Sequence, residues 1–352
     1  MKVLVAGHVA KDRQGGAAWA VLQYVLGLEK LSHKVRLVEF LPEPSDEVRA
    51  YFEALLRDFA IDGELLTEPR AFAGFDLVIN ISGSLAPGLI ESIPVRIYLD
   101  QDPAFNQLWQ EVGIDMRFAG HTHHATVGLS LGRPSCEIPT HGLEWIHTLP
   151  PVVLEHWPAA DDAAGRALTT IANFRSYGSI EHNGTFYGQK AHSLRDLLRL
   201  PARTGARLVL ALAVHPDERS DLEALATNGW ELVDPTCVAG TPAAYAGFIG
   251  SSWAEIGIAK HGYVISRCGW FSDRSTCYLA CGRPVIAQET GFSDYLPTGQ
   301  GLMAFADEDG AVAAIEVVKA DYERHARAAR RLAEESFNSD RVLTKLLKEV
   351  TA

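Results

Sequence analysis

The residues with the clearest chemical potential form one short segment, residues 267–275, which reads Arg-Cys-Gly-Trp-Phe-Ser-Asp-Arg-Ser. The segment precedes an expected helix, whose first backbone N–H groups have no partners within the helix. Hydroxyl and guanidinium donors beside such N–H groups favour the binding of an anion. We therefore predict an anion-binding cradle formed by Arg267, Gly269, Ser272, Asp273, Arg274 and Ser275. Asp273 has an alternative interpretation as the N-cap of the helix.

Two further cations lie in the middle of the chain. Arg175 follows an expected strand, and Lys190 comes after a loop that contains Gly and Asn. If this loop folds back, both cations converge on one anionic group. The alternative is that both are solvated loop residues.

Acidic and histidine side chains provide candidates for acid–base or metal chemistry. Asp100 and Asp102 follow an expected strand, and such a pair suits a hard cation, a substrate contact or a turn before Pro103. His8, His121 and His123 are candidates for a general base, because histidine titrates near neutral pH. His121 and His123 can also bind a metal, and a structural role is the default for each histidine. We expect no metal to be required.

A loop with two glycines, residues 7–16, follows the first expected strand and opens a helix. Gly15 and Gly16 allow the backbone to approach a ligand closely, and the free N–H groups at the helix N-terminus suit a phosphate. A tight turn that needs a positive φ is the alternative. The loop does not contain the G-x-G-x-x-G pattern, so a nicotinamide dinucleotide is not indicated.

Short apolar runs alternate with helical patterns along the chain, which indicates parallel strands with crossover helices. In the first part we expect strands at residues 3–6, 33–38, 76–80 and 95–99 and helices at 17–31 and 45–59. Residues 150–165, rich in Pro, Ala and Asp, form the expected linker. Beyond it we expect strands at residues 168–173, 207–214, 231–233, 256–258, 284–287 and 301–305. The matching helices are expected at 192–200, 220–228, 307–318, 321–336 and 340–350.

These elements predict an α/β protein with two Rossmann-like domains facing a central cleft. The expected domains are residues 1–155 and 166–335, and residues 336–352 form a last helix that can pack back on the first domain. Ligands of such sheets bind at the carboxyl ends of the strands, so we place the ligand between the domains.

Composition limits the classes of partner. The 352 residues carry a formal net charge of −12, which disfavours binding to nucleic acid or to an anionic membrane. No stretch is long and apolar enough to span a bilayer, and Met1 and Lys2 lead directly into a strand, so we expect no signal peptide. The 5 cysteines are few and odd in number, which favours a reducing cytoplasm over a disulfide framework.

Two motifs resemble the donor-binding half of nucleotide-sugar glycosyltransferases of the GT-B fold. Residues 267–272 resemble the His-Cys-Gly-Trp-Asn-Ser start of the family 1 signature, and residues 280–287 resemble the Ala-Cys-Gly-x-Pro-Val strand entry of the superfamily. Asp294 lies where such enzymes place a sugar-contacting loop. The chain departs from the retaining families, in which two glutamates stand where Gly269 and Cys277 stand here. Aligned on Arg267 instead, the ribose-binding acid of family 1 falls on Ser275.

The resemblance implies a transferase that moves a sugar from a nucleoside diphosphate sugar to a small-molecule or glycan acceptor. It implies that the second domain holds the donor with the cradle residues, Arg175 and Lys190, and that the acceptor lies near residues 7–16, Asp102 and residues 120–124. One of the three histidines is then the base of an inverting reaction, whereas a retaining reaction needs none. The nucleotide sugar is a co-substrate, so no other cofactor is expected. A GT-B-shaped epimerase or hydrolase and a non-catalytic nucleotide-sugar-binding protein remain alternatives.

Overall fold

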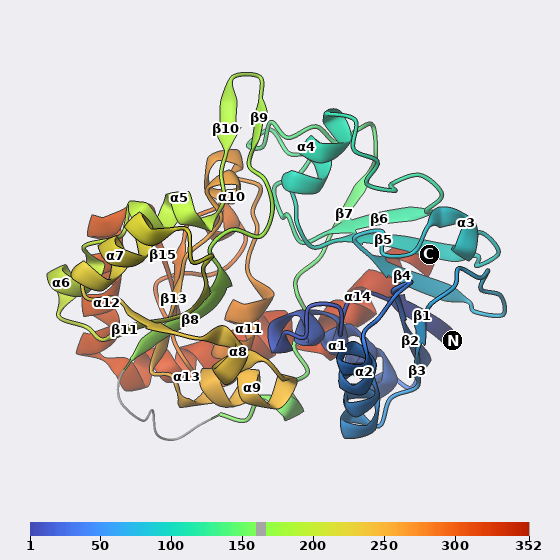
Figure 1. Cartoon of the computed structure of the whole chain (residues 1–352), viewed down its shortest axis with the longest axis horizontal. Helices are drawn as coiled ribbons and strands as arrows, with labels where there is room; N and C mark the ends of the chain where they lie inside the picture. The colour runs from blue at the N-terminus through green and yellow to red at the C-terminus, as the bar shows by residue number, and fades with distance from the viewer. Residues whose placement is uncertain (160–166, 352) are drawn as a thin grey trace.

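A computed structural model describes residues 1–159 and 167–351 of the chain. Two parallel sheets lie side by side, each flanked by helices, and both termini lie on the first half (Figure 1). The first sheet has the order β3-β2-β1-β4-β5-β6-β7 and the second β12-β11-β8-β13-β14-β15. The α/β architecture of two Rossmann-like domains is therefore confirmed.

The first half is formed by residues up to His147. Its strands are β1 (Lys2–Ala6), β2 (Lys34–Phe40), β3 (Gly63–Leu66), β4 (Leu77–Ile81), β5 (Val95–Asp100), β6 (His123–Thr126) and β7 (Trp145–His147). Its helices are α1 (Gly15–Lys30), α2 (Asp46–Phe59), α3 (Pro87–Ile90) and α4 (Phe105–Glu111). Residues 3–6 of β1 have no exposed surface, as expected for a central parallel strand that is covered on both faces.

The second half begins at Leu168. Its sheet contains β8 (Leu168–Asn173), β11 (Leu208–Ala213), β12 (Glu231–Val233), β13 (Ala254–Gly257), β14 (Val285–Gln288) and β15 (Leu302–Phe305). Its helices are α5 (Lys190–Arg195), α6 (Leu200–Thr204), α7 (Arg219–Thr227), α8 (Pro235–Ala239), α9 (Pro242–Ser251), α10 (His261–Ser266), α11 (Asp273–Ala280), α12 (Glu308–Ala320) and α13 (Tyr322–Leu332). An antiparallel hairpin of β9 (Ile180–His182) and β10 (Thr185–Tyr187) projects beside α4 of the first half (Figure 1).

Most long elements lie within two residues of their predicted bounds, and the differences have local causes. The helix predicted at residues 192–200 is two helices, α5 and α6, because Pro201 lacks an N–H group and lies in the first turn of a new helix. The helix predicted at 321–336 ends at Leu332 and continues as a π-helical turn, Ala333–Phe337. The prediction missed β3, β6, β7, β9 and β10, whose runs of three or four residues are too short to show a period.

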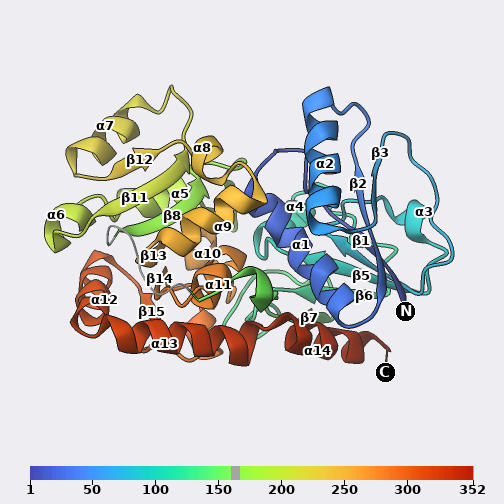
Figure 2. The same ribbon diagram turned by 90° about the horizontal axis from the view of Figure 1, so that it is seen from below.

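The chain passes between the halves twice, and the two crossing segments pair with each other. Val152 donates from its backbone N–H to the carbonyl of Phe337 (2.7 Å), and Ser339 donates in the same way to Val152 (2.9 Å). The last helix, α14 (Ser339–Thr351), then packs against α1 of the first half, so that α13 and α14 run beneath both halves (Figure 2). Of the predicted linker at 150–165, residues 160–165 lie outside the described residues.

One large apolar cluster extends across both halves. Trp19 of α1 packs against Trp157 with ring centroids 4.9 Å apart, and its indole N–H donates to the carbonyl of Pro242 (2.9 Å).

Among the described residues, no helix has both the length and the apolar character that a bilayer crossing requires.

Candidate active site

A cavity of about 510 Å³ lies between the two halves and takes its walls from both. The first half contributes residues of the 7–16 loop together with Gln101 and Asp102, which follow β5. The second half contributes the end of β8, the segment after β13 and the start of α11. The cavity thus lies at the carboxyl ends of parallel strands, where α/β sheets bind their ligands.

Lys190 is the cation whose charge is least compensated in this cavity. Its side chain lines the cavity but is 8% exposed, and its ammonium group donates to the backbone carbonyl of Ile258. In the described part of the chain no carboxylate forms an ion pair with it. Burial lowers the pKa of Lys190 well below its usual value, and the nearby charges of Arg274 and Lys260 lower it further. An anionic ligand would supply the missing counter-charge.

Arg274 and Ser272 lie at the start of α11 beside Lys190. The guanidinium of Arg274 donates to the carboxylate of Glu255 (2.6 Å) and to the carbonyl of Ile171 (3.0 Å), which fixes it across the ends of β13 and β8. Ser272 is the N-cap of α11, but its hydroxyl makes no capping hydrogen bond. Both residues line the cavity, as the predicted cradle requires.

Asp273 also lines the cavity, but its chemistry differs from that of the cradle donors. Burial raises the pKa of its carboxyl group. A carboxylate repels a phosphate and accepts hydrogen bonds from hydroxyl groups. Asp273 therefore suits a hydroxyl of a bound ligand and not the anion itself.

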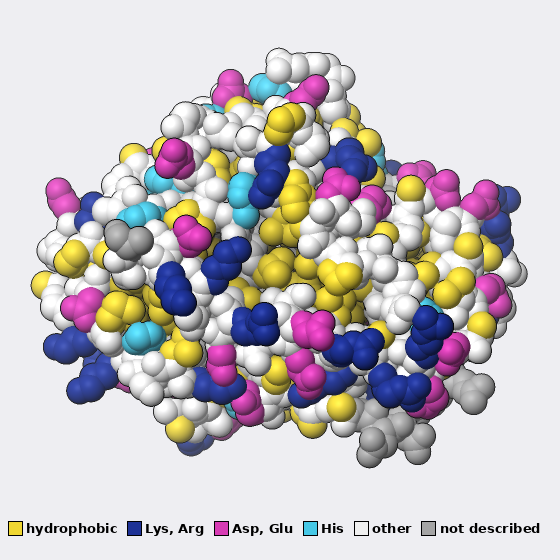
Figure 3. Space-filling view, turned by 180° about the vertical axis from the view of Figure 1, so that it is seen from behind, with side chains coloured by type: hydrophobic (Ala, Val, Ile, Leu, Met, Phe, Trp, Pro, Cys, Tyr) yellow, Lys and Arg dark blue, Asp and Glu magenta, His cyan; other side chains and the backbone are white. Residues whose placement is uncertain are grey.

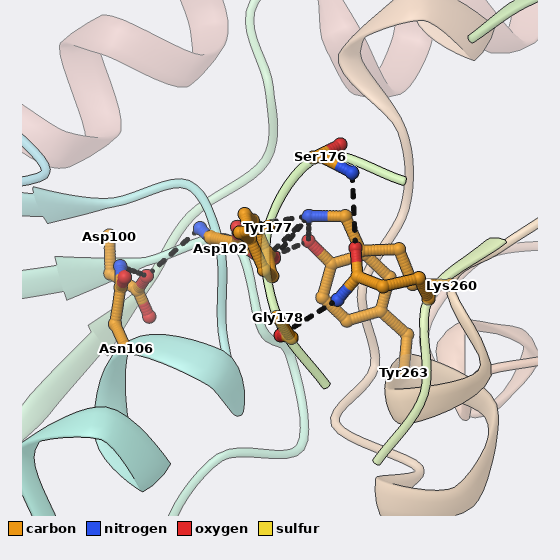
Figure 4. A network of polar contacts seen from close by, with 9 residues as sticks. Asp100, Asp102, Asn106, Ser176, Tyr177, Gly178, Lys260 and Tyr263 are labelled. Atoms are coloured by element: carbon orange, nitrogen blue, oxygen red, sulfur yellow. Dashed lines mark hydrogen bonds and ion pairs between the residues drawn. The ribbon is translucent and has the colours of Figure 1, made fainter. Parts of the chain in front are cut away.

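Asp102 joins the two halves across the cavity (Figure 4). Its carboxylate lies 3.0 Å from the ammonium of Lys260, and the hydroxyls of Tyr177 and Tyr263 also donate to it. The ammonium of Lys260 donates in addition to the hydroxyl of Tyr177. Asp102 comes from the loop after β5, whereas its three partners belong to the second half. This network was not foreseen from the sequence, although Lys260 follows a strand end.

Asp100 does not act together with Asp102. Its fully buried carboxylate accepts from Asn106 (2.7 Å), Gln107 (2.9 Å), Thr126 (2.9 Å) and the backbone N–H of Asp102 (3.0 Å). Burial raises its pKa to about 6. Hydrogen-bond donors of the protein occupy both carboxylate oxygens of Asp100, so this residue shapes the loop that carries Asp102 (Figure 4). Asp100 and Asp102 therefore do not form a shared binding site.

Four predicted donor residues lie outside the cavity. Arg175 forms an ion pair with Glu218 (2.5 Å). Arg267 is the C-cap of α10 in a left-handed conformation and pairs with Asp294 (3.6 Å), and both side chains are about half exposed. Ser275 is 2% exposed on α11 and is not among the residues that line the central cavity. The structure therefore does not bring Arg175, Arg267 and Asp294 together with Lys190 and Arg274, and Ser275, although it follows Arg274 in α11, is not among the residues that line the central cavity.

Two glycines that we predicted to let the backbone approach a phosphate instead allow the two halves to contact each other. A Cβ on Gly269 would lie 2.7 Å from the backbone nitrogen of Ser130, and its φ is +77°. A Cβ on Gly15 would lie 2.3 Å from the carbonyl oxygen of Thr241. The approach at both positions is protein to protein, which corrects the prediction for Gly15 and Gly269. Gly16 does line the cavity.

None of the three candidate histidines lines the central cavity. The Nε2 atom of His121 accepts a hydrogen bond from the amide of Asn80 (3.0 Å), and burial lowers the pKa of this histidine to about 4. His123 lies on β6 beside the hydroxyl of Thr122 (2.9 Å). His8 lies 3.3 Å from the carboxylate of Glu39 and faces a separate cavity. The structure therefore places all three away from the predicted donor.

A scan of protein-family models and a search of curated proteins each found no match to the chain. Solved structures do match over the whole length. The Anabaena protein HepE in complex with UDP and glucose has a TM-score of 0.65 at 12% identity, with 100% of this chain and 99% of that chain covered. An alpha-glucosyltransferase in complex with UDP has a TM-score of 0.66 at 11% identity, with 100% of both chains covered.

A further structure of the alpha-glucosyltransferase contains UDP and a 13-mer DNA, at a TM-score of 0.66 and 10% identity, with 100% of this chain and 99% of that chain covered. At these identities the likeness concerns the fold, which is shared from the first strand to the last helix. With two parallel sheets, a cavity between them and a last helix that returns to the first half, the chain has the GT-B fold of the nucleotide-sugar glycosyltransferases.

Proposed function

We propose that the protein is a glycosyltransferase that moves a sugar from a nucleoside diphosphate sugar to an acceptor in the central cavity. The observation that carries this proposal is Lys190, a buried cation without a carboxylate partner among the described residues, whose side chain lines a cavity between two Rossmann-like halves. The two neighbours that contain UDP support a nucleoside diphosphate as the anion.

The donor diphosphate is expected between Lys190 and the start of α11. Lys190 and Arg274 provide fixed cations there, and Ser272 provides a hydroxyl that the helix does not use. When the bond between the sugar carbon and the diphosphate oxygen breaks, negative charge grows on that oxygen. Cations that are already in place stabilise this charge without reorganisation, which lowers the barrier.

The proton of the acceptor hydroxyl must go to a group inside the cavity. The carboxylates that line it are Asp12, Asp102 and Asp273. Asp102 is held by three donors of the second half, whereas Asp12, on the acceptor side, has no hydrogen-bond or ion-pair partner among the described residues. We propose Asp12 as the candidate base, and the leaving phosphate oxygen is the alternative acceptor of the proton.

A small molecule or glycan fits the acceptor role better than a polyanion. The net charge is −12, and on the face shown in Figure 3 Lys and Arg side chains are interspersed with Asp and Glu. Binding to a nucleic-acid backbone requires a concentrated basic surface. The alpha-glucosyltransferase neighbour that contains DNA makes a DNA probe a necessary control.

Calorimetric titration of UDP tests the donor assignment. We expect Lys190→Ala to weaken UDP binding by about 1.5–3 kcal/mol, the usual worth of a hydrogen bond to a charged group. Arg175→Ala is the matched control, because Arg175 pairs with Glu218 outside the cavity, and it should bind UDP as the wild type does. Wild-type affinity in Lys190→Ala would contradict the proposal. Product analysis with and without acceptors then separates a transferase from an epimerase, a hydrolase or a binding protein.

A further inference from the structure

A second cavity, of about 420 Å³, opens at the carboxyl edge of the first sheet. Its walls follow three neighbouring strands: His8 comes after β1, Leu41 after β2, and Ser82 to Ser84 after β4. The sheet order β2-β1-β4 places the reversal of strand order between β1 and β4. The cavity thus occupies in the first half the type of crevice in which open parallel sheets bind ligands.

A buried carboxylate shapes one wall of this cavity. Glu39 has no exposed surface and accepts from the backbone N–H groups of Val9 (3.1 Å), Ala10 (2.8 Å) and Lys11 (3.0 Å). The Nδ1 atom of His8 lies 3.3 Å from the same carboxylate. Glu39 therefore holds the loop in one conformation and orients the ring of His8, so that Nε2 is left for a ligand.

The charge of the lining is positive, although the chain as a whole is acidic. Among the described residues, Lys11 and Arg117 are the cations of the lining, and Asp115 is its one carboxylate. Asp115 already accepts the backbone N–H of Arg117 (2.8 Å), and Arg117 is positioned by the carbonyl of Gly83 (2.9 Å). The Lys11 ammonium has no hydrogen-bond or ion-pair partner within residues 1–159 and 167–351. Lys11 and Arg117 supply N–H donors suited to an oxyanion, and the Nε2 atom of His8 joins them as a donor when its imidazole is protonated.

Adjacent residues of one loop line the second cavity and the central cavity. Lys11 lines the second cavity, and the next residue, Asp12, lines the central cavity. A ligand anchored at Lys11 can therefore extend over this loop toward Asp12 and the donor. The volume is in the range of small-molecule sites.

We propose that the second cavity binds the acceptor through a phosphate ester, so that the acceptor is a phosphorylated sugar or polyol. This proposal rests on the glycosyl-transfer function proposed above. Lys11 and Arg117 hold the phosphate group, and the Nε2 atom of His8 donates to it when the imidazole is protonated. The hydroxyl of Ser82 is available to the polyol, whereas that of Ser84 already donates to Asn80 (3.0 Å) and can only accept. The acceptor hydroxyl then points toward the central cavity.

Calorimetry on the full chain compares a hexose 6-phosphate, the unphosphorylated hexose and inorganic phosphate. We expect the hexose 6-phosphate to bind at least about tenfold more tightly than either of the others. We expect Lys11→Ala and Arg117→Ala each to weaken its binding by about tenfold, while UDP binding is unchanged. Arg36→Ala is the matched control, because Arg36 pairs with Asp62 on the surface of the same half (2.9 Å).

Equal binding of hexose and hexose phosphate, or wild-type affinity in Lys11→Ala, would overturn the phosphate-ester assignment. Equal binding of inorganic phosphate would also overturn it and leave a simple anion site. Lys190→Ala separates this test from that of the donor, because it should weaken UDP binding and leave hexose 6-phosphate binding unchanged. Loss of both would show that the probe occupies the donor cavity. A wild-type chain that binds the hexose phosphate but none of UDP, GDP, dTDP and ADP would instead contradict the glycosyltransferase function.

Discussion

The ion pair between Asp102 and Lys260 should connect the two halves measurably. In Asp102→Asn the side chain keeps its size, but the ammonium of Lys260 loses its carboxylate while its side chain remains only 15% exposed. Removing one partner of a buried pair costs about 3–5 kcal/mol, because the remaining charge stays buried without compensation. The Asp102 side chain is 22% exposed at the cavity wall, so we expect a loss of about 2–3 kcal/mol in the free energy of unfolding.

A double-mutant cycle isolates the pair. Urea unfolding at neutral pH is measured for Asp102→Asn, Lys260→Met and the double variant. If the loss in Asp102→Asn arises from an uncompensated charge, then Lys260→Met should recover more than half of it. Asp62→Asn provides the surface control, because it breaks a pair whose side chains are 41% and 57% exposed. That change should cost less than about 0.5 kcal/mol.

Two results would refute this reasoning. Additive losses in the double variant would mean that Asp102 and Lys260 contribute independently. A cost in Asp102→Asn no larger than that in Asp62→Asn would mean that water solvates Lys260 fully when its partner is removed.

Three further outcomes are expected. Gly269→Ala should destabilise the protein by about 1–3 kcal/mol in urea unfolding, because its Cβ would lie 2.7 Å from the nitrogen of Ser130 at a φ of +77°; wild-type stability would mean that the halves separate freely there. Asp273→Asn should weaken binding of UDP, which carries a ribose, more than binding of inorganic pyrophosphate, which has no hydroxyl groups, and equal effects would exclude a hydroxyl contact. Burial lowers the pKa of Lys190 well below its usual value, so an ammonium at this position reduces stability below the folded-state pKa. The wild type should therefore gain stability relative to Lys190→Met as the pH rises from the folded-state pKa toward the usual lysine pKa of about 10.4, and its affinity for UDP should fall over the same interval; parallel pH profiles for both chains would contradict the assigned shift.

The sequence predicts best the structural features that depend on residues close together in the chain, such as the bounds of strands and the caps of helices. The run at residues 168–173 is entirely apolar or β-branched before its last residue, and it forms β8 at those bounds. Ser45 before a helical pattern caps α2 by accepting from the backbone N–H of Val48 (3.3 Å). Lys190, Ser272 and Arg274 were identified because each lies next to a strand or helix end, and the ends of parallel strands converge on one edge.

The remaining errors concern contacts between residues far apart in the chain. The partners of Asp102 lie beyond residue 170, so no local pattern shows that its carboxylate is already engaged. Gly269 meets Ser130, and Gly15 meets Thr241, only because the two halves dock. A glycine that admits a phosphate and one that admits a second backbone have the same sequence signature, since both require a missing Cβ.

The replacement of the expected glutamate by Cys277 has a consequence for how a donor fits the site. The thiol of Cys277 is buried and donates to the backbone carbonyl of Asp273 (3.4 Å), so it offers nothing to a ligand. Asp273 lies one helical turn earlier on the same face of α11, and its carboxylate does line the cavity. This shift moves the acid toward the helix N-terminus, close to the expected diphosphate. The carboxylate of Asp273 is compatible with a nearby diphosphate under two conditions. Hydroxyl groups of the donor must lie between the carboxylate and the phosphates, and Arg274, the next residue, must offset the charge of the carboxylate. We therefore expect the hydroxyls of the donor to lie against Asp273, in the first turn of α11. A glutamate at position 277 would instead hold them one turn further along the helix.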